Sequence, residues 1–149
     1  MTFLIWLTAR STSDLLDSAL VGDGLTGDEF AIYSMLSAPT PITPSILARW
    51  MAAPATTVTS YVKRFEARGH VRREKNSADR RSYHIRLTDA GREAHQHAQA
   101  SFEPLRDALV VALGDEESEV REALLTLREA LDRVRVVGGD APSEGSWTH

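Results

Sequence analysis

The stretch Pro54-Ala-Thr-Thr-Val-Thr-Ser-Tyr-Val-Lys-Arg-Phe-Glu-Ala-Arg-Gly69 decides the fold of this 149-residue chain. No helix breaker interrupts it between Pro54, which suits a first helical turn, and Gly69, which suits the left-handed residue that follows a helix. The stretch therefore predicts a helix over residues 55–68.

This helix has two chemically different sides. One side carries apolar and aromatic residues at helical spacing and is expected to face the core: Val58, Tyr61, Val62 and Phe65. The opposite side carries small residues, hydroxyls and cations: Thr56, Ser60, Lys63 and Ala67, flanked by Thr57, Thr59 and Arg64. Small side chains let a helix enter the major groove of DNA, where hydroxyls bond base edges or phosphates and cations meet the backbone. A solvated face is the alternative, but threonine is a poor helix former, so the hydroxyl run needs another reason.

Signals for neighbouring helices and strands indicate that this helix is part of a winged helix-turn-helix over about residues 26–88. Thr26 and Glu29 have the spacing of a capping box, for a helix that ends near residue 37. Thr43 caps a short helix to about residue 51, and two helices about three residues apart are a helix-turn-helix signature. Downstream, residues 71–75 and 82–87 have strand-like patterns around a polar run, which predicts a β-hairpin.

Charge is distributed unevenly along the chain, whose net charge is −4. Residues 43–88 contain ten cationic and three acidic residues, a net +7, so the remainder carries −11. Such a basic centre suits a protein that presents one face to a polyanion. Arg80 and Arg81 lie at the hairpin tip, where a narrow minor groove would attract arginine; a solvated loop is the alternative. Asp79 is expected to bond the turn backbone or to hold Arg81 in place.

The flanking segments predict amphipathic helices over residues 3–21 and 89–136. The last of these has an apolar stripe made by Val120, Leu124, Leu127, Leu131 and Val134. One small monomer has little room to bury such stripes, so we expect the flanking helices to pair across a two-fold axis in a homodimer. The alternative is that they bury their apolar stripes in a core within one monomer. The expected fold is mainly α with a small β-hairpin wing, a single unit over residues 1–137, followed by a disordered tail over residues 138–149.

Several classes of function lack the residues they need. The chain has no cysteine, which excludes disulfides and thiolate metal sites and argues against secretion. Its start resembles neither a signal peptide nor a membrane anchor, so a soluble cytoplasmic protein fits best. We find no phosphate loop, nucleophile elbow or metal-spaced cluster, so we expect no enzyme and no cofactor. His95 and His97 lie on different faces of a predicted helix, so we expect two surface histidines and no shared metal site. The rival hypothesis is a winged-helix module that binds protein, which would need an exposed apolar patch at the wing.

Residues 25–91 resemble one known family. Asp79-Arg-Arg81, five further residues and Leu87-Thr-Asp-Ala-Gly91 resemble the wing signature of MarR-type transcriptional regulators, and Thr57-Val-Thr59, Arg64-Phe-Glu66 and Gly69 resemble their recognition helix. The resemblance implies a dimer with intertwined first and last helices, a repressor of its own or neighbouring genes, and a pseudo-palindromic operator in duplex DNA. It also implies a minor-groove role for Arg81, supported by Asp79.

The resemblance raises two further expectations. Ala52 and Ala53 stand where the family often has a hydroxyl residue, which puts the capping of the recognition helix in question. Family members commonly bind small aromatic acids between the dimer helices and the winged domain. Trp6, Arg10 and Tyr33 would supply an aromatic wall and an anion partner for such an effector; core packing and solvation are the alternatives. Lack of cysteine removes the peroxide-sensing branch.

Overall fold

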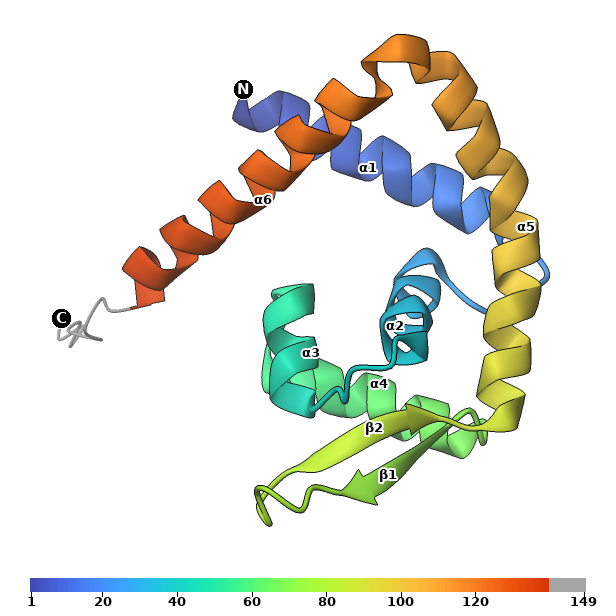
Figure 1. Cartoon of the computed structure of the whole chain (residues 1–149), viewed down its shortest axis with the longest axis vertical. Coiled ribbons are helices and arrows are strands. Elements are labelled where there is room, and N and C mark those ends of the chain that lie inside the picture. Colours follow the sequence, from blue (N-terminus) through green and yellow to red (C-terminus); the bar gives the residue numbers. More distant parts are fainter. Residues whose placement is uncertain (140–149) are drawn as a thin grey trace, which may run out of the picture. The chain divides into compact units, whose positions relative to one another are not determined.

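The computed structural model describes the backbone of residues 1–139 and the side chains of residues 1–134. The elements in chain order are α1 (Thr2–Ala19), α2 (Gly27–Ser37), α3 (Pro44–Met51), α4 (Ala55–Ala67), β1 (Val71–Lys75), β2 (Tyr83–Leu87), α5 (Asp89–Leu113), the 3-10 helix η1 (Gly114–Glu116) and α6 (Glu117–Gly139) (Figure 1). The predicted fold class, mainly α with a β-hairpin wing, is confirmed. Two compact units divide within α5, between Asp107 and Ala108. The expectation of a single unit over residues 1–137 stays a prediction.

The helix-turn-helix and the hairpin share one hydrophobic core in the first unit. Val58, Val62 and Phe65 on α4 are fully buried, as predicted, and Tyr61 is half-buried beside them. The rings of Tyr33 on α2 and Phe65 on α4 are nearly perpendicular, with 4.8 Å between their centroids. This core orients α4, because burying one side of the helix leaves the opposite side to solvent.

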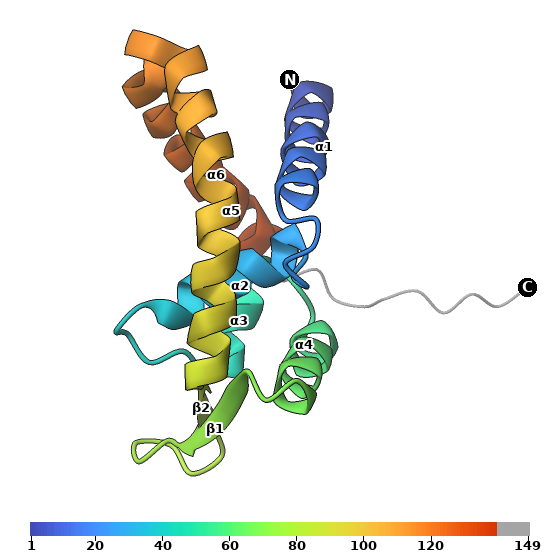
Figure 2. The same ribbon diagram turned by 90° about the vertical axis from the view of Figure 1, so that its right-hand side faces the viewer.

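The two strands form an antiparallel hairpin in which Val71 pairs with Leu87 and Lys75 pairs with Tyr83. The backbone N–H of Ile85 donates to the carbonyl of Ile42 at 2.8 Å, which ties the segment before α3 to the outer edge of β2. Two views show the loop end of the hairpin extending beyond α2, α3 and α4 (Figures 1 and 2). Its tip is therefore free to contact a partner.

Local signals account for the starts of α2 and α3. Thr26 and Glu29 form the predicted capping box at α2, with 3.3 Å in both directions between side chain and backbone N–H. Thr43 Oγ1 accepts the N–H of Ile46 at the start of α3. Helix α4 begins after Pro54 with no side-chain cap, in agreement with the doubt raised by the alanine pair. Ala52 has a left-handed φ of 54°, which closes the turn between the two helices.

Helix α4 ends in a Schellman motif. Gly69 has a φ of 74°, its N–H donates to the carbonyl of Glu66, and the N–H of His70 donates to the carbonyl of Phe65, both at 2.9 Å. A left-handed residue is needed there, and glycine adopts it without a Cβ penalty. The turn sends the chain directly into β1.

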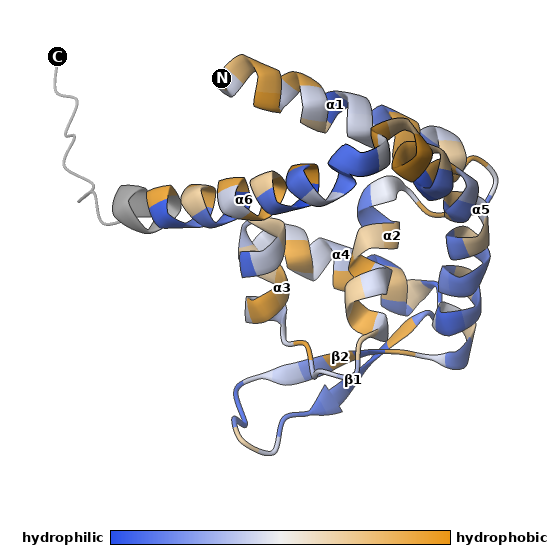
Figure 3. Cartoon of the chain, turned by 45° about the horizontal axis from the view of Figure 1, so that its top comes forward, coloured by the Kyte–Doolittle hydropathy of each residue, from blue (hydrophilic) through white to orange (hydrophobic). Residues whose placement is uncertain are grey.

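Helix α1 buries none of its residues fully. Its apolar side chains are largely exposed, with Phe3 at 70%, Leu4 at 66% and Trp6 at 58%. Figure 3 colours much of the N-terminal part of α1 orange, which marks hydrophobic residues. In a single chain, the apolar face of α1 is therefore largely exposed to solvent.

The second unit contains the end of α5, η1 and α6. The final helix starts at Glu117, after a turn of 3-10 helix at its entry. It continues through Gly139, so the expected tail is helical at residues 138–139, since each added residue extends an existing helix by one hydrogen bond. The rest of that tail lies outside the described residues. Leu124, Leu131 and Val134 on α6 are largely exposed.

Candidate nucleic-acid interface

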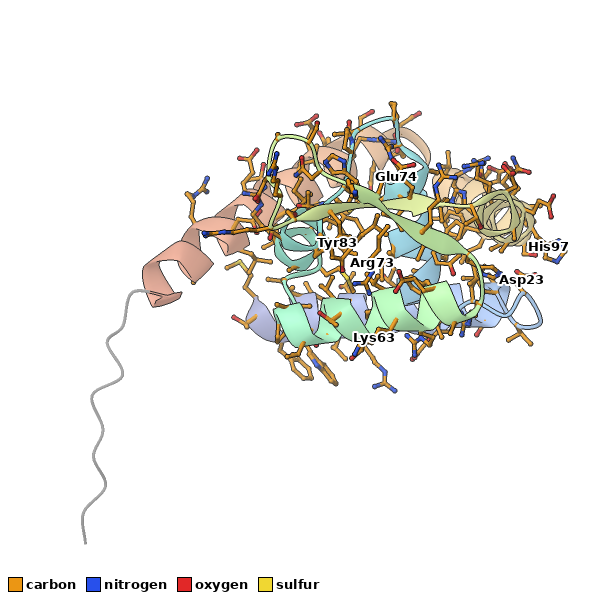
Figure 4. The ribbon with its side chains drawn as sticks, turned by 90° about the horizontal axis from the view of Figure 1, so that it is seen from below. Asp23, Lys63, Arg73, Glu74, Tyr83 and His97 are labelled. Carbon is orange, nitrogen blue, oxygen red and sulfur yellow. The ribbon has the colours of Figure 1, made fainter. Side chains whose placement is uncertain are left out.

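The outer face of α4 carries the predicted hydroxyl and cationic residues. Thr56, Thr59, Ser60 and Lys63 are exposed, and Thr57 is half-buried. Thr59 Oγ1 donates to the carbonyl of Ala55 at 2.8 Å, and Ser60 Oγ donates to that of Thr56 at 3.0 Å. These bonds leave the hydroxyl oxygens free to accept from the amino groups of adenine or cytosine. Lys63 lies on the side of α4 away from the hairpin (Figure 4).

Arg64 differs from the sequence-based expectation because its guanidinium is already bound. Its Nε lies 3.0 Å from Oε1 of Glu29, and Nη1 of Arg68 lies 2.9 Å from Oε2 of the same carboxylate. The Glu29 side chain is only 1% exposed, and its hydrogen bond raises the pKa of Arg68. Arg64 also lies over the ring of Tyr61, 4.8 Å from its centroid. Its first role is to hold α4 against α2.

Arg73 joins the end of α4 to the hairpin. Its Nε and Nη2 donate to the two carboxylate oxygens of Glu66, both at 2.8 Å, and this hydrogen bond raises its pKa. The guanidinium also lies 4.6 Å from the centroid of the Tyr83 ring on β2. Figure 4 shows Arg73 between α4 and the hairpin. Sequence reasoning missed this link, although opposite charges on the two sides of the Gly69 turn were a signal for it.

The hairpin tip is shaped by side-chain bonds to its own backbone. Asp79 Oδ1 accepts the N–H of Arg81 at 2.9 Å, and its carbonyl accepts the N–H of Ser82 at 3.1 Å. Asp79 was expected either to bond the turn backbone or to hold Arg81 in place, and this hydrogen bond is of the first kind. The side chains of Arg80 and Arg81 are exposed and make no ion pair with any described residue. A hollow of about 720 Å³ beside the tip is lined in part by Lys75, Arg80 and Tyr83.

The ten cations of residues 43–88 fall into two groups. Five are bound to the carboxylates of Glu29, Glu66 or Glu74: Arg64, Arg68, Arg72, Arg73 and Arg86. The other five have no ion pair within the described part of the chain: Arg49, Lys63, Lys75, Arg80 and Arg81. The charge count over residues 43–88 included Arg49 and Lys75, but the sequence-based prediction of DNA contacts did not name them. The unpaired group is the part of the positive charge that is available to a polyanion.

Comparison with known proteins gives one family model and several solved structures that are similar to this chain. A sequence model of the MarR family matches residues 25–83. The Mycobacterium tuberculosis transcriptional regulator MosR, solved in complex with DNA, is 28% identical, covering 90% of this chain and 97% of that one with a TM-score of 0.76. The Staphylococcus aureus MepR–DNA complex is 21% identical, covering 87% and 95% of the two chains, with a TM-score of 0.73. The part of the chain that contains α2, α3, α4 and β1 is thus similar in sequence to the MarR family.

A third solved structure has a similar fold. It is a mutant of MarR from E. coli complexed with operator DNA, 23% identical, covering 84% of this chain and 90% of that one with a TM-score of 0.73. No curated protein gives a significant sequence match. Across residues 1–139, no helix has both the length and the apolarity needed to cross a membrane.

Of the three residues expected to bind an effector, one is buried in the core. Tyr33 is fully buried, its hydroxyl lies 3.0 Å from Nδ1 of His70, and burial raises its pKa to about 12. It is therefore a core residue, because α2 is packed against α4, and the expectation that it lines an effector wall needs correction. Trp6 is exposed, and Arg10 pairs with Asp14 at 3.4 Å on the same helix. An effector at Trp6 and Arg10 stays a prediction.

The two histidines of α5 have different surroundings. His95, expected at the surface, is buried, lies 2.9 Å from Oγ of Ser34 and stacks on Phe30, and burial lowers its pKa. His97 is exposed, and its Nε2 lies 3.1 Å from Oδ1 of Asp23 (Figure 4). Within the described residues, no three potential ligands cluster as a metal site would require.

Proposed function

We propose that this chain is a homodimeric DNA-binding transcriptional regulator. The recognition helix α4 enters the major groove, and the hairpin wing reaches the minor groove. The observation that carries the proposal is the position of the unpaired cations: Lys63 lies on the outer face of α4, and Arg80 and Arg81 lie at the exposed hairpin tip. Unpaired cations on two projecting elements suit phosphate and minor-groove contacts.

The proposed contacts divide by chemistry. Thr56, Thr59 and Ser60, with Thr57 at the edge, offer hydroxyls to base edges or phosphates. Lys63 binds phosphate, and Arg81 enters the minor groove from a turn that Asp79 holds in shape. Arg64 does not need to contact DNA in this proposal, because its ion pair with Glu29 holds α4 against α2.

The homodimer is supported by the exposed apolar residues of α1, since Phe3, Leu4 and Trp6 would be covered by a second copy. A two-fold dimer requires a pseudo-palindromic operator with half-sites about one helical turn apart. We propose that the protein acts in the cytoplasm as a repressor of its own or neighbouring genes, and that a small aromatic or anionic ligand releases it. It performs no catalysis in this proposal.

A protein-binding winged helix is not favoured. Such a module would present apolar residues at the wing, whereas the tip carries Asp79, Arg80 and Arg81, all exposed.

Selection of bound sequences from random duplex DNA at fixed salt tests the proposal. We expect enrichment of a pseudo-palindrome, which then serves as the operator in titrations. Failure to enrich any palindrome would contradict sequence-specific binding and favour the protein-binding alternative.

Substitution of the wing separates paired from unpaired arginines. Arg81→Ala should weaken operator binding by about 1–3 kcal/mol, or roughly five- to 150-fold, without changing dimerisation. Arg72→Ala is the matched control, because it removes the same charge from the same hairpin but from a guanidinium already paired with Glu74. Lys63→Ala should reduce the salt slope of binding by about 0.9, as expected for one lost phosphate contact. Unchanged operator affinity in the Arg81 variant would contradict the wing assignment.

A further inference from the structure

Glu29 has a buried carboxylate that binds two arginines of the recognition helix. Arg64 Nε lies 3.0 Å from Oε1, and Arg68 Nη1 lies 2.9 Å from Oε2. The same Oε2 accepts the backbone N–H of Thr26 at 3.3 Å. Charge-assisted hydrogen bonds to a buried carboxylate are stronger than neutral ones. The two guanidiniums are therefore held against the first turn of α2.

The two arginines continue the row of hydroxyl residues on α4. Residues four positions apart lie next to each other along a helix, so Thr56, Ser60, Arg64 and Arg68 form one row. The arginine side chains are 51% and 35% exposed, in contrast to the 1% exposure of Glu29 beneath them. They border the surface proposed to meet DNA, and without the carboxylate both would be available to phosphates.

We propose that Glu29 is a positioning residue that determines specificity by competing with DNA phosphates for Arg64 and Arg68. This inference rests on the proposed function. Phosphate contacts carry no sequence information, so free guanidiniums can form them in many binding registers on random DNA, whereas base contacts fix one register at the operator. Glu29 restrains two such contacts and leaves Lys63 as the cation that α4 presents to the phosphate backbone, while the ion pairs fix the orientation of the helix on α2. The operator then gains relative to the competing random sites.

The test is the salt dependence of binding by Glu29→Gln. Glutamine occupies the third position of a capping box as well as glutamate does, so this variant removes the charge and keeps the cap. On random-sequence duplex DNA, we expect the slope of log affinity against log salt to steepen by about 1.8, from two added phosphate contacts of about 0.9 each. Between 200 and 50 mM salt, this is an additional gain of about twelve-fold. The ratio of operator to random-sequence affinity should fall.

The triple variant Glu29→Gln, Arg64→Gln, Arg68→Gln is the matched control, in which the cluster has no charge. Its slope on random-sequence DNA should return to that of the wild type, because the wild-type arginines do not reach phosphates. A triple-variant slope shallower than wild type by about 0.9 or more would overturn the inference, because those arginines would then contact DNA in the native protein.

A merely structural Glu29 would lower affinity in the single variant without steepening its slope, and that result also counts against the inference. If the single variant does not fold, the triple variant decides alone. Failure of the proposed function is distinguishable, because the wild type would then enrich no palindrome, before any variant is compared.

Discussion

Gly91 should be essential to the stability of the winged domain, for a reason that can be read from distances. It lies in the first turn of α5, directly against the backbone that leaves α4. A Cβ added at Gly91 would lie 2.0 Å from the carbonyl oxygen of His70 and 2.9 Å from its carbonyl carbon. Relieving the first contact to 3.0 Å requires about 1 Å of backbone movement. Gly91→Ala therefore introduces a clash with backbone atoms, which cannot rotate away.

The His70 carbonyl is held in place from several sides. It accepts the N–H of Thr88 at 3.0 Å, while Thr88 Oγ1 donates to the carbonyl of Gly69 at 2.6 Å and accepts the N–H of Gly91 at 3.1 Å. Overpacking costs about 1–3 kcal/mol and loss of one hydrogen bond about 1 kcal/mol, so we expect Gly91→Ala to lower the free energy of unfolding by about 2–4 kcal/mol. At roughly 2–4 °C per kcal/mol for a chain of this length, Tm should fall by about 5–15 °C.

The sign of the change distinguishes this explanation from helix propensity. In an ordinary helical position, Gly→Ala stabilises by up to about 1 kcal/mol. Thermal unfolding followed by circular dichroism, at one fixed protein concentration because the protein is proposed to dimerise, measures the difference. Ala90→Gly, at the exposed neighbouring position, measures how much the choice between alanine and glycine matters in this turn when no clash is involved. It should lower the free energy of unfolding by less than about 1 kcal/mol. An unchanged or higher Tm for Gly91→Ala would refute the close-approach argument.

Two further predictions concern pH and assembly. Burial lowers the pKa of His95 in the folded protein, so the unfolded chain takes up the proton first as pH falls below about 6.5. Stability from this residue is therefore present above that pH and lost below it. Urea unfolding between pH 7.5 and pH 5 should show a shallower loss in His95→Gln, and parallel curves for the two proteins would contradict this. Leu4→Glu should dissociate the homodimer in sedimentation analysis, since Leu4 is 66% exposed in a single chain. Ala9→Glu, at an exposed position on a different side of the same helix, serves as the control. A Leu4 variant that remains dimeric would exclude α1 from the interface.

Much of the fold was predictable because its signals are local. The capping box at Thr26, the cap at Thr43, the helical phase of α4 and the left-handed Gly69 each depend on residues within about one or two turns of one another. The exposed face of α4 followed directly, because burying Val58, Val62 and Phe65 leaves one orientation for the rest. The hairpin and its arginine tip were likewise predictable from alternation around a polar run.

The candidate site was less predictable wherever charges find distant partners. Arg64 has the sequence position of a DNA contact, yet its carboxylate partner lies on another helix, 35 positions earlier in the chain. The aromatic ring of Tyr33 suggested a residue that lines an effector site, but the packing of α2 on α4 buries it completely. His95 had the appearance of a surface residue until its contacts with Ser34 and Phe30 were known.

By itself, the sequence determined the order of the elements, their caps, the outer face of α4 and the resemblance to MarR-type regulators, because local hydrogen bonding and helical periodicity depend on neighbours in the chain. Tertiary structure alone decided which cations are neutralised. Glu29 and Glu66 take up Arg64, Arg68 and Arg73 only once α2, α4 and β1 are packed together. Charge along a chain is a sum, whereas the charge that reaches a partner depends on which carboxylates lie within hydrogen-bond distance.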